Sequence, residues 1–360
     1  MENKFKICII GSGIVGLAIA QRLSEFYSNI IVVEKEDTFG QHVSSRNSEV
    51  IHSGFYYPKD SLKSILCIDG NNKLYKFAEK YHIHHKKCGK LIVINKKEDE
   101  TELIRVKNHA LNCGLKDLKI LDRKESKIIE PNVNCYKALY IPSTGIIDSH
   151  SVMSKLEYLS KNKGVDFLYN TSVTAINKKD DYYKISINNS DDFFESDIII
   201  NAAGLWSEKI SSMIGINNYE IEYYKGDYFK SRAIRNLNCL IYPIPKISSL
   251  GIHTVLSLNG DVSFGPNIYK VESIDYTIDD RYKKQYVKEV NDLIEVDDLD
   301  LYHDFSGIRP KIKFDGCFND FIIKNETERG YNNFINLIGI DSPGLTSCLS
   351  IARYVKSIIN

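Results

Sequence analysis

The chain has 360 residues, 43% of them hydrophobic and 26% charged, which is the composition of an ordinary globular protein with more than one domain. Its 47 basic residues balance 47 acidic residues, so no overall positive field indicates a nucleic acid partner. The eight cysteines form no CxxC pair, which argues against a disulfide framework and a zinc site and favours a reducing, cytoplasmic compartment.

The first elements along the chain predict a βαβ unit. Residues 5–10 are typical of a buried parallel strand, residues 14–26 carry apolar side chains at helical spacing, and residues 30–34 are typical of a second buried strand. Glycines interrupt the apolar run after residue 10, so this run indicates neither a signal peptide nor a membrane span. We expect no transmembrane segment, and we leave open a peripheral contact with the inner face of a membrane.

The rest of the chain alternates between helical and strand patterns and has no internal repeat. We therefore expect an α/β protein with a Rossmann-like dinucleotide-binding type of domain over 1–87, 142–218 and 304–360, and a second, antiparallel-sheet α+β domain over 88–141 and 219–303. The predicted elements are helices over 60–81, 98–111, 148–162 and 282–295, strands over 88–94, 165–168, 172–176, 182–187, 193–194, 197–200 and 334–339, and a final helix ending near residue 359.

The turn after the first strand carries the strongest local motif, Gly11-Ser-Gly13-Ile-Val-Gly16. The first glycine permits a tight turn, the second lets the backbone approach a pyrophosphate, and the third lets the helix pack closely on the strand. The phosphates then face the positive end of the helix dipole. Because the motif follows a strand and opens a helix, it predicts a dinucleotide site.

Two further features favour FAD as the dinucleotide. Glu34 ends the second strand, where its carboxylate would accept hydrogen bonds from the adenosine ribose and would repel a 2′-phosphate, which disfavours NADP. A second glycine turn, Gly339 to Thr346, opens the last helix. A helix N-terminus there would stabilise negative charge on a reduced flavin, and a simple NAD enzyme has no use for such a site.

The segment Ser44 to Pro58 resembles the flavin-proximal segment of L-2-hydroxyglutarate dehydrogenases and oxidases. The wider family is the D-amino-acid oxidase-like flavoproteins, which include glycerol-3-phosphate dehydrogenase and glycine oxidase. Ser306 to Pro310 is similar to that family's Gly-hydrophobic-Arg-Pro segment, so the resemblance implies that Arg309 binds a substrate carboxylate or phosphate. Further segments with this resemblance follow in the same order along the chain, at 88–93, 145–148, 225–228, 242–245, 250–253 and 264–267.

The motifs and the resemblance together indicate the site residues. Removing the hydroxyl proton of an alcohol during hydride transfer requires a base, and an imidazole titrates in a suitable range. We slightly prefer His253 to His52 as this base, and both stay open. The expected catalytic residues are His253, His52, Arg309 and Tyr57. The expected FAD-binding residues are Gly11, Gly13, Ile14, Val15, Gly16, Glu34, Lys35, Ser44, Ser45, Arg46, Asn47, Val173, Ala203, Gly204, Arg309, Pro343, Gly344, Leu345 and Thr346.

Several of these residues fit a plain structural role as well. Arg309 fits a structural ion pair, and Tyr57 and Tyr228 fit simple packing, because the chain has 23 tyrosines. For Trp206 we expect a role in packing and not in catalysis. We expect no metal site, since the histidines at 82, 84 and 85 have no cysteine or carboxylate nearby to complete a ligand set.

The first hypothesis is an FAD-dependent oxidoreductase that oxidises an L-2-hydroxy acid, with L-2-hydroxyglutarate as the substrate that the resemblance implies. The alternatives are an amino-acid or amine oxidase, an enzyme like glycerol-3-phosphate dehydrogenase, and a non-catalytic or assembly-type flavoprotein. The sequence leaves the electron acceptor open among oxygen, a quinone and an electron-transfer protein.

Overall fold

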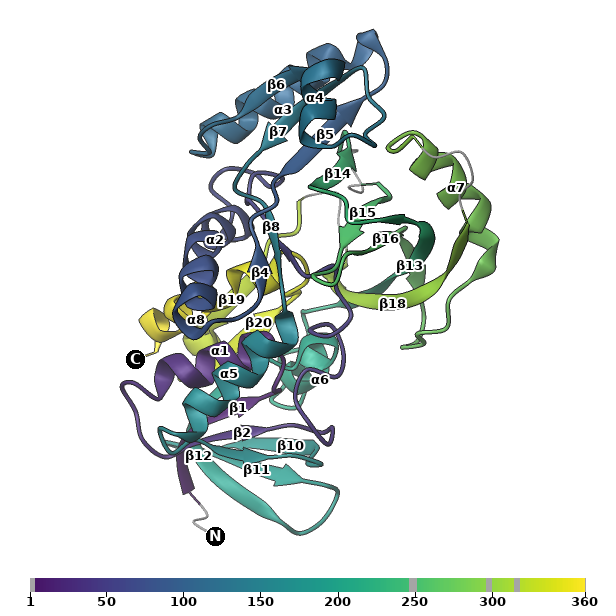
Figure 1. Ribbon diagram of the computed structural model, residues 1–360. Coiled ribbons are helices and arrows are strands. Elements are labelled where there is room, and N and C mark those ends of the chain that lie inside the picture. The colour runs from purple at the N-terminus through teal and green to yellow at the C-terminus, as the bar shows by residue number, and fades with distance from the viewer. Residues whose placement is uncertain (1–3, 246–250, 296–299, 314–317, 360) are drawn as a thin grey trace. The chain divides into compact units, whose positions relative to one another are not determined.

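The computed structural model describes residues 4–245, 251–295, 300–313 and 318–359. The chain, coloured by residue number in Figure 1, divides into two compact units. Unit 1 contains Met1–Ser45, Ser149–Tyr223 and Arg309–Asn360, and unit 2 contains Arg46–Asp148 and Tyr224–Ile308. The predicted FAD-binding domain also included residues 46–87, 142–148 and 304–308, which lie in unit 2. Compactness does not test which residues bind a cofactor, so the predicted domain boundaries stay a prediction.

Unit 1 is built on a sheet whose central strands are parallel. β1 (Lys4–Ile10) lies between β12 (Phe193–Asn201) and β2 (Ile30–Val33), and β20 (Phe334–Ile338) pairs with the other side of β12. β9 (Asp166–Leu168) continues the parallel order beyond β2. The antiparallel additions are β10 (Val173–Lys178), β11 (Tyr183–Ile187) and β19 (Ile322–Asn325).

The helices of unit 1 include α1 (Ile14–Leu23), α5 (Ser149–Lys161), α6 (Ser207–Ser212) and α8 (Gly344–Ile358). α1 packs against both α5 and α8, as Figure 1 shows. β1, α1 and β2 follow one another as the predicted βαβ unit, and every residue of β2 is buried. Within the described ranges, no helix is long and apolar enough to cross a membrane.

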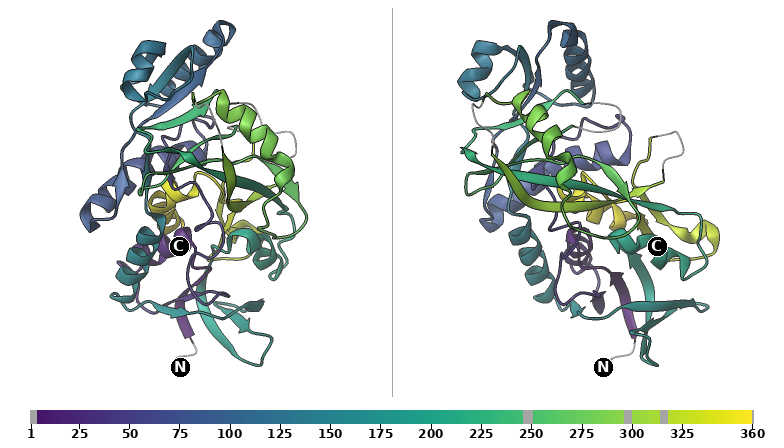
Figure 2. Two further views of the ribbon diagram at one scale, coloured as in Figure 1. Left: turned by 45° about the vertical axis from the view of Figure 1, so that its right-hand side comes forward. Right: turned by 90° about the vertical axis from the view of Figure 1, so that its right-hand side faces the viewer.

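The described residues of unit 2 form three separate sheets and four α-helices. The largest of them has the order β15-β16-β13-β17, and β18 pairs with β13. The green and yellow-green ribbons of Figure 2 include the strands of this sheet. The chain passes between the two units within β13 and β18. The strands of this largest sheet are β15 (His253–Leu256), β16 (Asp261–Gly265), β13 (Ile221–Arg235), β17 (Tyr269–Val271) and β18 (Leu301–Ile312). The second sheet contains, in order, β14 (Leu240–Pro243), β5 (Lys90–Ile94), β7 (Lys137–Ile141) and β6 (Lys119–Asp122). The third contains, in order, β3 (Val50–Ile51), β8 (Gly145–Ile147) and β4 (His85–Lys86). The helices are α2 (Leu62–Tyr81), α3 (Glu100–Asn112), α4 (Arg123–Ile129) and α7 (Lys283–Asn291).

The long, strongly periodic elements lie where the sequence predicts them, and the differences are local. The predicted strands at 193–194 and 197–200 are one continuous strand, β12. Glu195 and Ser196 in its middle pair with Lys4 and Phe5 near the start of β1, where a polar side chain does not interrupt the hydrogen bonding. The short helices α4 and α6 were not predicted, because helices of seven and six residues show little periodicity.

Candidate functional site

Four segments that were predicted to bind the cofactor meet at one edge of the unit 1 sheet. β20, β12, β1 and β2 are neighbouring parallel strands, so their carboxyl ends lie at the same edge. Ligands of open α/β sheets bind outside such carboxyl ends. We call this region the nucleotide edge. The segments that follow the four strand ends, in the same order, are Gly339 to Thr346, Ala202 to Gly204, Gly11 to Gly16, and Glu34 to Lys35.

Each glycine of the first turn occupies a position with a different steric demand. Gly11 has a φ of +103°, and a Cβ there would lie 2.6 Å from the Ala202 carbonyl oxygen. A Cβ on Gly16 would lie 2.0 Å from the Gly11 carbonyl oxygen, so α1 packs directly on the end of β1. Gly13 has an ordinary φ of −66°, and its Cβ would meet Ser44 Oγ at 3.0 Å. The fold therefore requires the first and third glycines, whereas Gly13 leaves bare backbone at the helix N-terminus.

Side-chain hydrogen bonds hold this turn in shape. The Ile14 backbone N–H, in the first turn of α1 with Val15, donates to Ser44 Oγ at 2.9 Å. The Ser12 backbone N–H and hydroxyl donate to Glu34 Oε2 at 2.8 and 3.0 Å. α1 has no acidic residue in its first turn. The positive potential of the helix N-terminus is therefore left for a phosphate.

Lys35, which follows Glu34, is held by protein groups. Its Nζ pairs with Glu36 and lies 3.9 Å from the centroid of the Trp206 ring. His42 is 2.8 Å from the same carboxylate and packs edge-on against Trp206. The hydrogen bond from Lys35, and after it the one from His42, lowers the pKa of the Glu36 carboxyl. Trp206 thus packs on two basic side chains and stabilises the loop after β2.

Val173 and Gly204 lie in segments that flank the nucleotide edge. The Thr171 backbone N–H donates to the Glu34 carbonyl at 2.8 Å, and Val173 begins β10 two residues later. Gly204 has a φ of +54°, with open space where a Cβ would point. The Ala203 N–H before it donates to the side-chain oxygen of a residue at the end of β12. The Thr171 hydrogen bond therefore holds the chain before Val173 against the segment that follows β2, and Gly204 leaves open space beside the end of β12.

The second glycine turn leads into α8. Pro343 is the N-cap residue and Gly344 the first helical residue, followed by Leu345 and the buried Thr346, and the first turn has no acidic side chain. α8 packs against α1, and each helix begins just after a parallel strand of the same sheet. Two helix N-termini therefore lie at the nucleotide edge, where their dipoles favour an anionic dinucleotide. These residues fit the predicted cofactor.

Arg46 lies in unit 2. Its guanidinium carbon is 3.9 Å from the centroid of the Tyr276 ring, and Nη1 donates to the Ser306 carbonyl at 3.4 Å. A Cβ on Gly307 would lie 2.4 Å from the Arg46 carbonyl oxygen. The Arg46 backbone is therefore pressed against the strand segment that leads to Arg309.

The backbones of the other residues in this predicted segment are anchored. Asn47 Oδ1 accepts from the backbone N–H two residues later at 2.7 Å, and Ser45 Oγ donates to a carbonyl five residues earlier in unit 1. The half-buried His52 has a carbonyl that accepts from Asn71 Nδ2 at 3.0 Å. The Tyr57 carbonyl lies 3.0 Å from a histidine nitrogen on α3. These contacts fix the course of the chain around the predicted catalytic side chains.

His253 is only 4% exposed and lies in β15. Its Nδ1 is 3.1 Å from the Thr254 carbonyl, and its ring stacks face to face on Tyr242, with centroids 3.8 Å apart and planes 10° apart. Tyr242 is not among the site residues predicted from the sequence. β14 and β15 become neighbours only in the tertiary fold, so no local sequence pattern predicts that the Tyr242 and His253 rings stack.

Arg309 is half-buried in β18, beside the buried Pro310. Among the described residues, no carboxylate forms an ion pair with its guanidinium. The structural ion pair that sequence analysis weighed against substrate binding is therefore not formed in the described part of the chain. Both prongs of the guanidinium can receive an anion.

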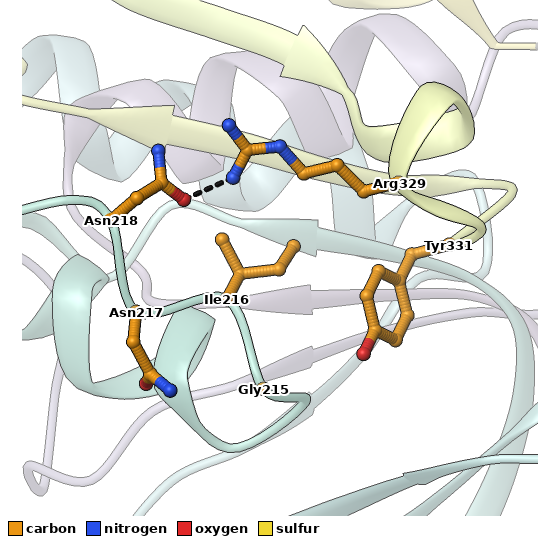
Figure 3. Close-up of a pocket in the computed structure, with 6 residues that line it drawn as sticks. All are labelled: Gly215, Ile216, Asn217, Asn218, Arg329 and Tyr331. Carbon is orange, nitrogen blue, oxygen red and sulfur yellow. Dashed lines mark hydrogen bonds between the residues drawn. The ribbon is translucent and has the colours of Figure 1, made fainter.

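A pocket in unit 1 lies away from the nucleotide edge (Figure 3). Arg329 and Tyr331, which line it, precede β20, whereas the nucleotide edge follows the carboxyl end of that strand. The Arg329 guanidinium points toward Asn218 and donates a hydrogen bond to its side chain. The other residues that line the pocket are Gly215, Ile216 and Asn217. This pocket is therefore not the predicted cofactor site.

Comparisons with known proteins agree with this geometry. Residues 6–358 match the family described as FAD dependent oxidoreductase. The chain is 32% identical over 403 residues to the mitochondrial L-2-hydroxyglutarate dehydrogenase of Arabidopsis thaliana, covering 99% of this chain and 83% of that protein. It is 29% identical to the L-2-hydroxyglutarate dehydrogenase of Indibacter alkaliphilus, covering 98% of each.

A solved structure shares the fold over the whole chain. Dithionite-reduced L-alpha-glycerophosphate oxidase from Mycoplasma pneumoniae, with FAD bound, superposes with a TM-score of 0.88 at 25% identity. The similarity covers 100% of this chain and 95% of that one.

Proposed function

The chain belongs to the family of FAD-dependent oxidoreductases, and on that premise we propose that it oxidises an L-2-hydroxy acid, with L-2-hydroxyglutarate as the substrate. The predicted cofactor, FAD, and the predicted fold class are confirmed by this membership. The observation that carries the proposal is the guanidinium of Arg309, which no described carboxylate neutralises. The similarity over nearly the whole chain to L-2-hydroxyglutarate dehydrogenases of a plant and a bacterium supports the choice of substrate.

The nucleotide edge would hold the cofactor. Gly13 and the N-terminus of α1 would receive the pyrophosphate, Glu34 the adenosine ribose, and the N-terminus of α8 the flavin end. When bound, FAD accepts the hydride from the substrate carbon. The protein's own task is then to bind the substrate anion, orient the hydroxyl group and remove its proton.

We assign these tasks to three side chains. Arg309 would bind the substrate carboxylate through two parallel charge-assisted hydrogen bonds. His253 would take the hydroxyl proton on its imidazole, with His52 as the other candidate base. Arg46, beside the strand that leads to Arg309, would bind the second carboxylate of L-2-hydroxyglutarate.

A second candidate is oxidation of a phosphorylated alcohol. A guanidinium binds phosphate as readily as carboxylate, and the structurally similar glycerophosphate oxidase carries that name. The two candidates differ in the anion beside the reacting carbon, which a substrate panel separates directly.

The test is anaerobic bleaching of the flavin absorbance in the purified holoenzyme. The panel contains L-2-hydroxyglutarate, D-2-hydroxyglutarate, L-lactate, L-glycerol 3-phosphate and an L-amino acid. We expect L-2-hydroxyglutarate to reduce the flavin fastest, because it alone offers the L configuration and two carboxylates. Equal rates with L-lactate would remove the role of a second carboxylate, and fastest reduction by the phosphate ester would favour the second candidate. An unbleached flavin with every compound would favour the non-catalytic alternative.

Arg309 variants test the two parallel hydrogen bonds to the substrate carboxylate, the two-pronged clamp, in the same assay. Arg309→Ala should raise the half-saturating concentration of substrate by at least about 100-fold, since two charge-assisted hydrogen bonds are lost and each contributes roughly 1.5–3 kcal/mol. Arg309→Lys keeps the charge without the planar fork and should recover only part of that loss. Arg353→Lys, at an exposed position on α8, is the matched control. A normal half-saturating concentration in Arg309→Lys would exclude the two-pronged clamp.

We also propose that the protein acts in the cytoplasm. Seven cysteines in the described ranges are free thiols, as expected in a reducing compartment, and Cys317 lies outside the described residues.

A further inference from the structure

Lys90 is a fully buried lysine, with 0% of its surface exposed. It is the first residue of β5, a strand whose five residues are all buried. Its backbone pairs with Leu240 of β14 on one side and Ile141 of β7 on the other. Lysine is among the residue types that are least often buried without a charged partner, so its presence in this sheet requires a reason.

Aromatic side chains from two other segments surround the Lys90 amine. Nζ donates a hydrogen bond to the Tyr56 hydroxyl at 2.8 Å and lies 4.3 Å from the centroid of the Tyr56 ring. It also lies 5.3 Å from the Phe55 centroid and 4.6 Å from the Tyr242 centroid. Cys67 on α2 is a further titratable neighbour. In the described part of the chain, no carboxylate forms an ion pair with Lys90.

This arrangement is costly for the fold. Burial lowers the pKa of the Lys90 amine to about 7, because the charged form has lost its water. Replacing buried ionic groups by apolar side chains of similar volume is often neutral or stabilising. A methionine would fill the same space, so packing alone does not account for the amine.

The Lys90 amine is linked to His253 through one ring. Tyr242, which Lys90 contacts, stacks face to face on the His253 imidazole with centroids 3.8 Å apart. The imidazole is buried, and a ring that is stacked in this way keeps its plane. The orientation of the candidate base therefore depends on where Tyr242 lies. We call Lys90, Phe55, Tyr56, Tyr242 and His253 the Lys90 cluster.

We infer that Lys90 is a positioning residue for the proposed oxidation: its amine holds Tyr56 and Tyr242, and Tyr242 fixes the plane of the His253 imidazole that takes the hydroxyl proton. This inference rests on the proposed function with His253 as the base. Lys90 itself contacts neither substrate nor cofactor in this role. Its effect on the reaction passes through the Tyr242 ring.

The experiment compares holoenzymes carrying Lys90→Met and Lys137→Met. Lys137 lies in β7 of the same sheet, but it is partly exposed and paired with Glu100. In Lys90→Met we expect flavin reduction at saturating substrate to slow by about ten-fold or more, since small misplacements of a reacting group have effects of that size or larger. The half-saturating concentration should stay within about two-fold of wild type, because substrate contacts are intact.

Two readouts separate positioning from simple packing. The pH profile of flavin reduction in Lys90→Met should move to higher pH, since removing a nearby positive charge raises the pKa of an imidazole. The melting temperature of Lys90→Met should be equal to or higher than that of wild type. If Lys90 only filled space, its replacement would change the rate only together with the stability. A slower reaction without a loss of stability would therefore indicate a positioning role.

The outcomes are distinguishable from those of the proposed function. If the wild-type flavin is not bleached by L-2-hydroxyglutarate, the proposed substrate fails, and Lys90 is measured with whichever panel compound reduces the flavin. If Lys90→Met matches Lys137→Met in rate and pH profile, the inference is overturned. Should Lys90→Met not fold, Tyr56→Phe removes only the accepting oxygen, and a normal rate and pH profile in that variant would overturn the inference equally.

Discussion

The nucleotide edge of unit 1 and the Lys90 cluster of unit 2 are built in different ways. The nucleotide edge consists mostly of backbone: glycine turns, strand ends and the N-termini of α1 and α8. The Lys90 cluster consists of large side chains, an amine, three phenyl or phenol rings and an imidazole, which come from four separate segments of the chain. A site made of backbone tolerates few large side chains, whereas changes in a side-chain cluster reduce function gradually. Changes at the first should remove the cofactor, and changes at the second should alter rates.

The largest expected effects are at the first glycine turn. Gly16→Leu should prevent folding, because even its Cβ would lie 2.0 Å from the Gly11 carbonyl oxygen, which is backbone and cannot move aside. Gly13→Leu should fold but lack FAD, because Gly13 has an ordinary φ and its Cβ approaches only the Ser44 side chain. Circular dichroism measures folding, and absorbance after purification measures bound flavin.

Gly13→Ala is the matched control for this pair, since it adds one atom at the same backbone position. It should retain more flavin than Gly13→Leu. Full FAD occupancy in Gly13→Leu would show that the pyrophosphate does not approach this residue. A folded, yellow Gly16→Leu protein would mean that α1 does not need to pack directly on β1.

The next largest effects are expected at the two candidate bases. Loss of a general base typically slows the chemical step by about 10²–10⁴-fold. We expect that loss for His253→Ala and a smaller one for His52→Ala, because the structure holds the His253 ring on Tyr242. Stopped-flow reduction of the flavin at saturating substrate measures both. Near-normal rates in both variants would remove histidine from the mechanism.

The smallest expected effect is the pH dependence of stability at Lys90. The folded pKa is lowered to about 7, so between that pH and about 10.4 the unfolded chain binds a proton that the folded chain does not. The free energy of unfolding of the wild type should therefore increase relative to that of Lys90→Met as pH rises through this window, by a few kcal/mol at most. Urea unfolding at pH 7, 8, 9 and 10 measures the difference. A constant difference would show that the amine is not desolvated, and Lys137→Met should show no such gain.

Much of the fold could be predicted because its signals are local. β2 consists of four consecutive buried residues, and α8 follows a glycine turn. The hydrophobic pattern and the turn residues alone therefore identify both elements. Glu34 could be placed because a strand ends there. The continuous strand β12 was divided in two, because its polar middle pairs with the start of β1, and that pairing is not visible along the chain.

The sequence by itself determined the first glycine turn of the nucleotide edge, since a backbone that must approach a phosphate requires glycine at fixed spacings, and those glycines are close together in the chain. Only the tertiary structure brought Lys90, Tyr242 and His253 together, because each lies in a different strand and no local sequence pattern connects the three. The same holds for Arg309: that no carboxylate of the described residues forms an ion pair with it is a property of its surroundings in space. The steric requirements of the backbone can be recognised in the local sequence. The contacts of long side chains depend instead on which strands become neighbours in the fold.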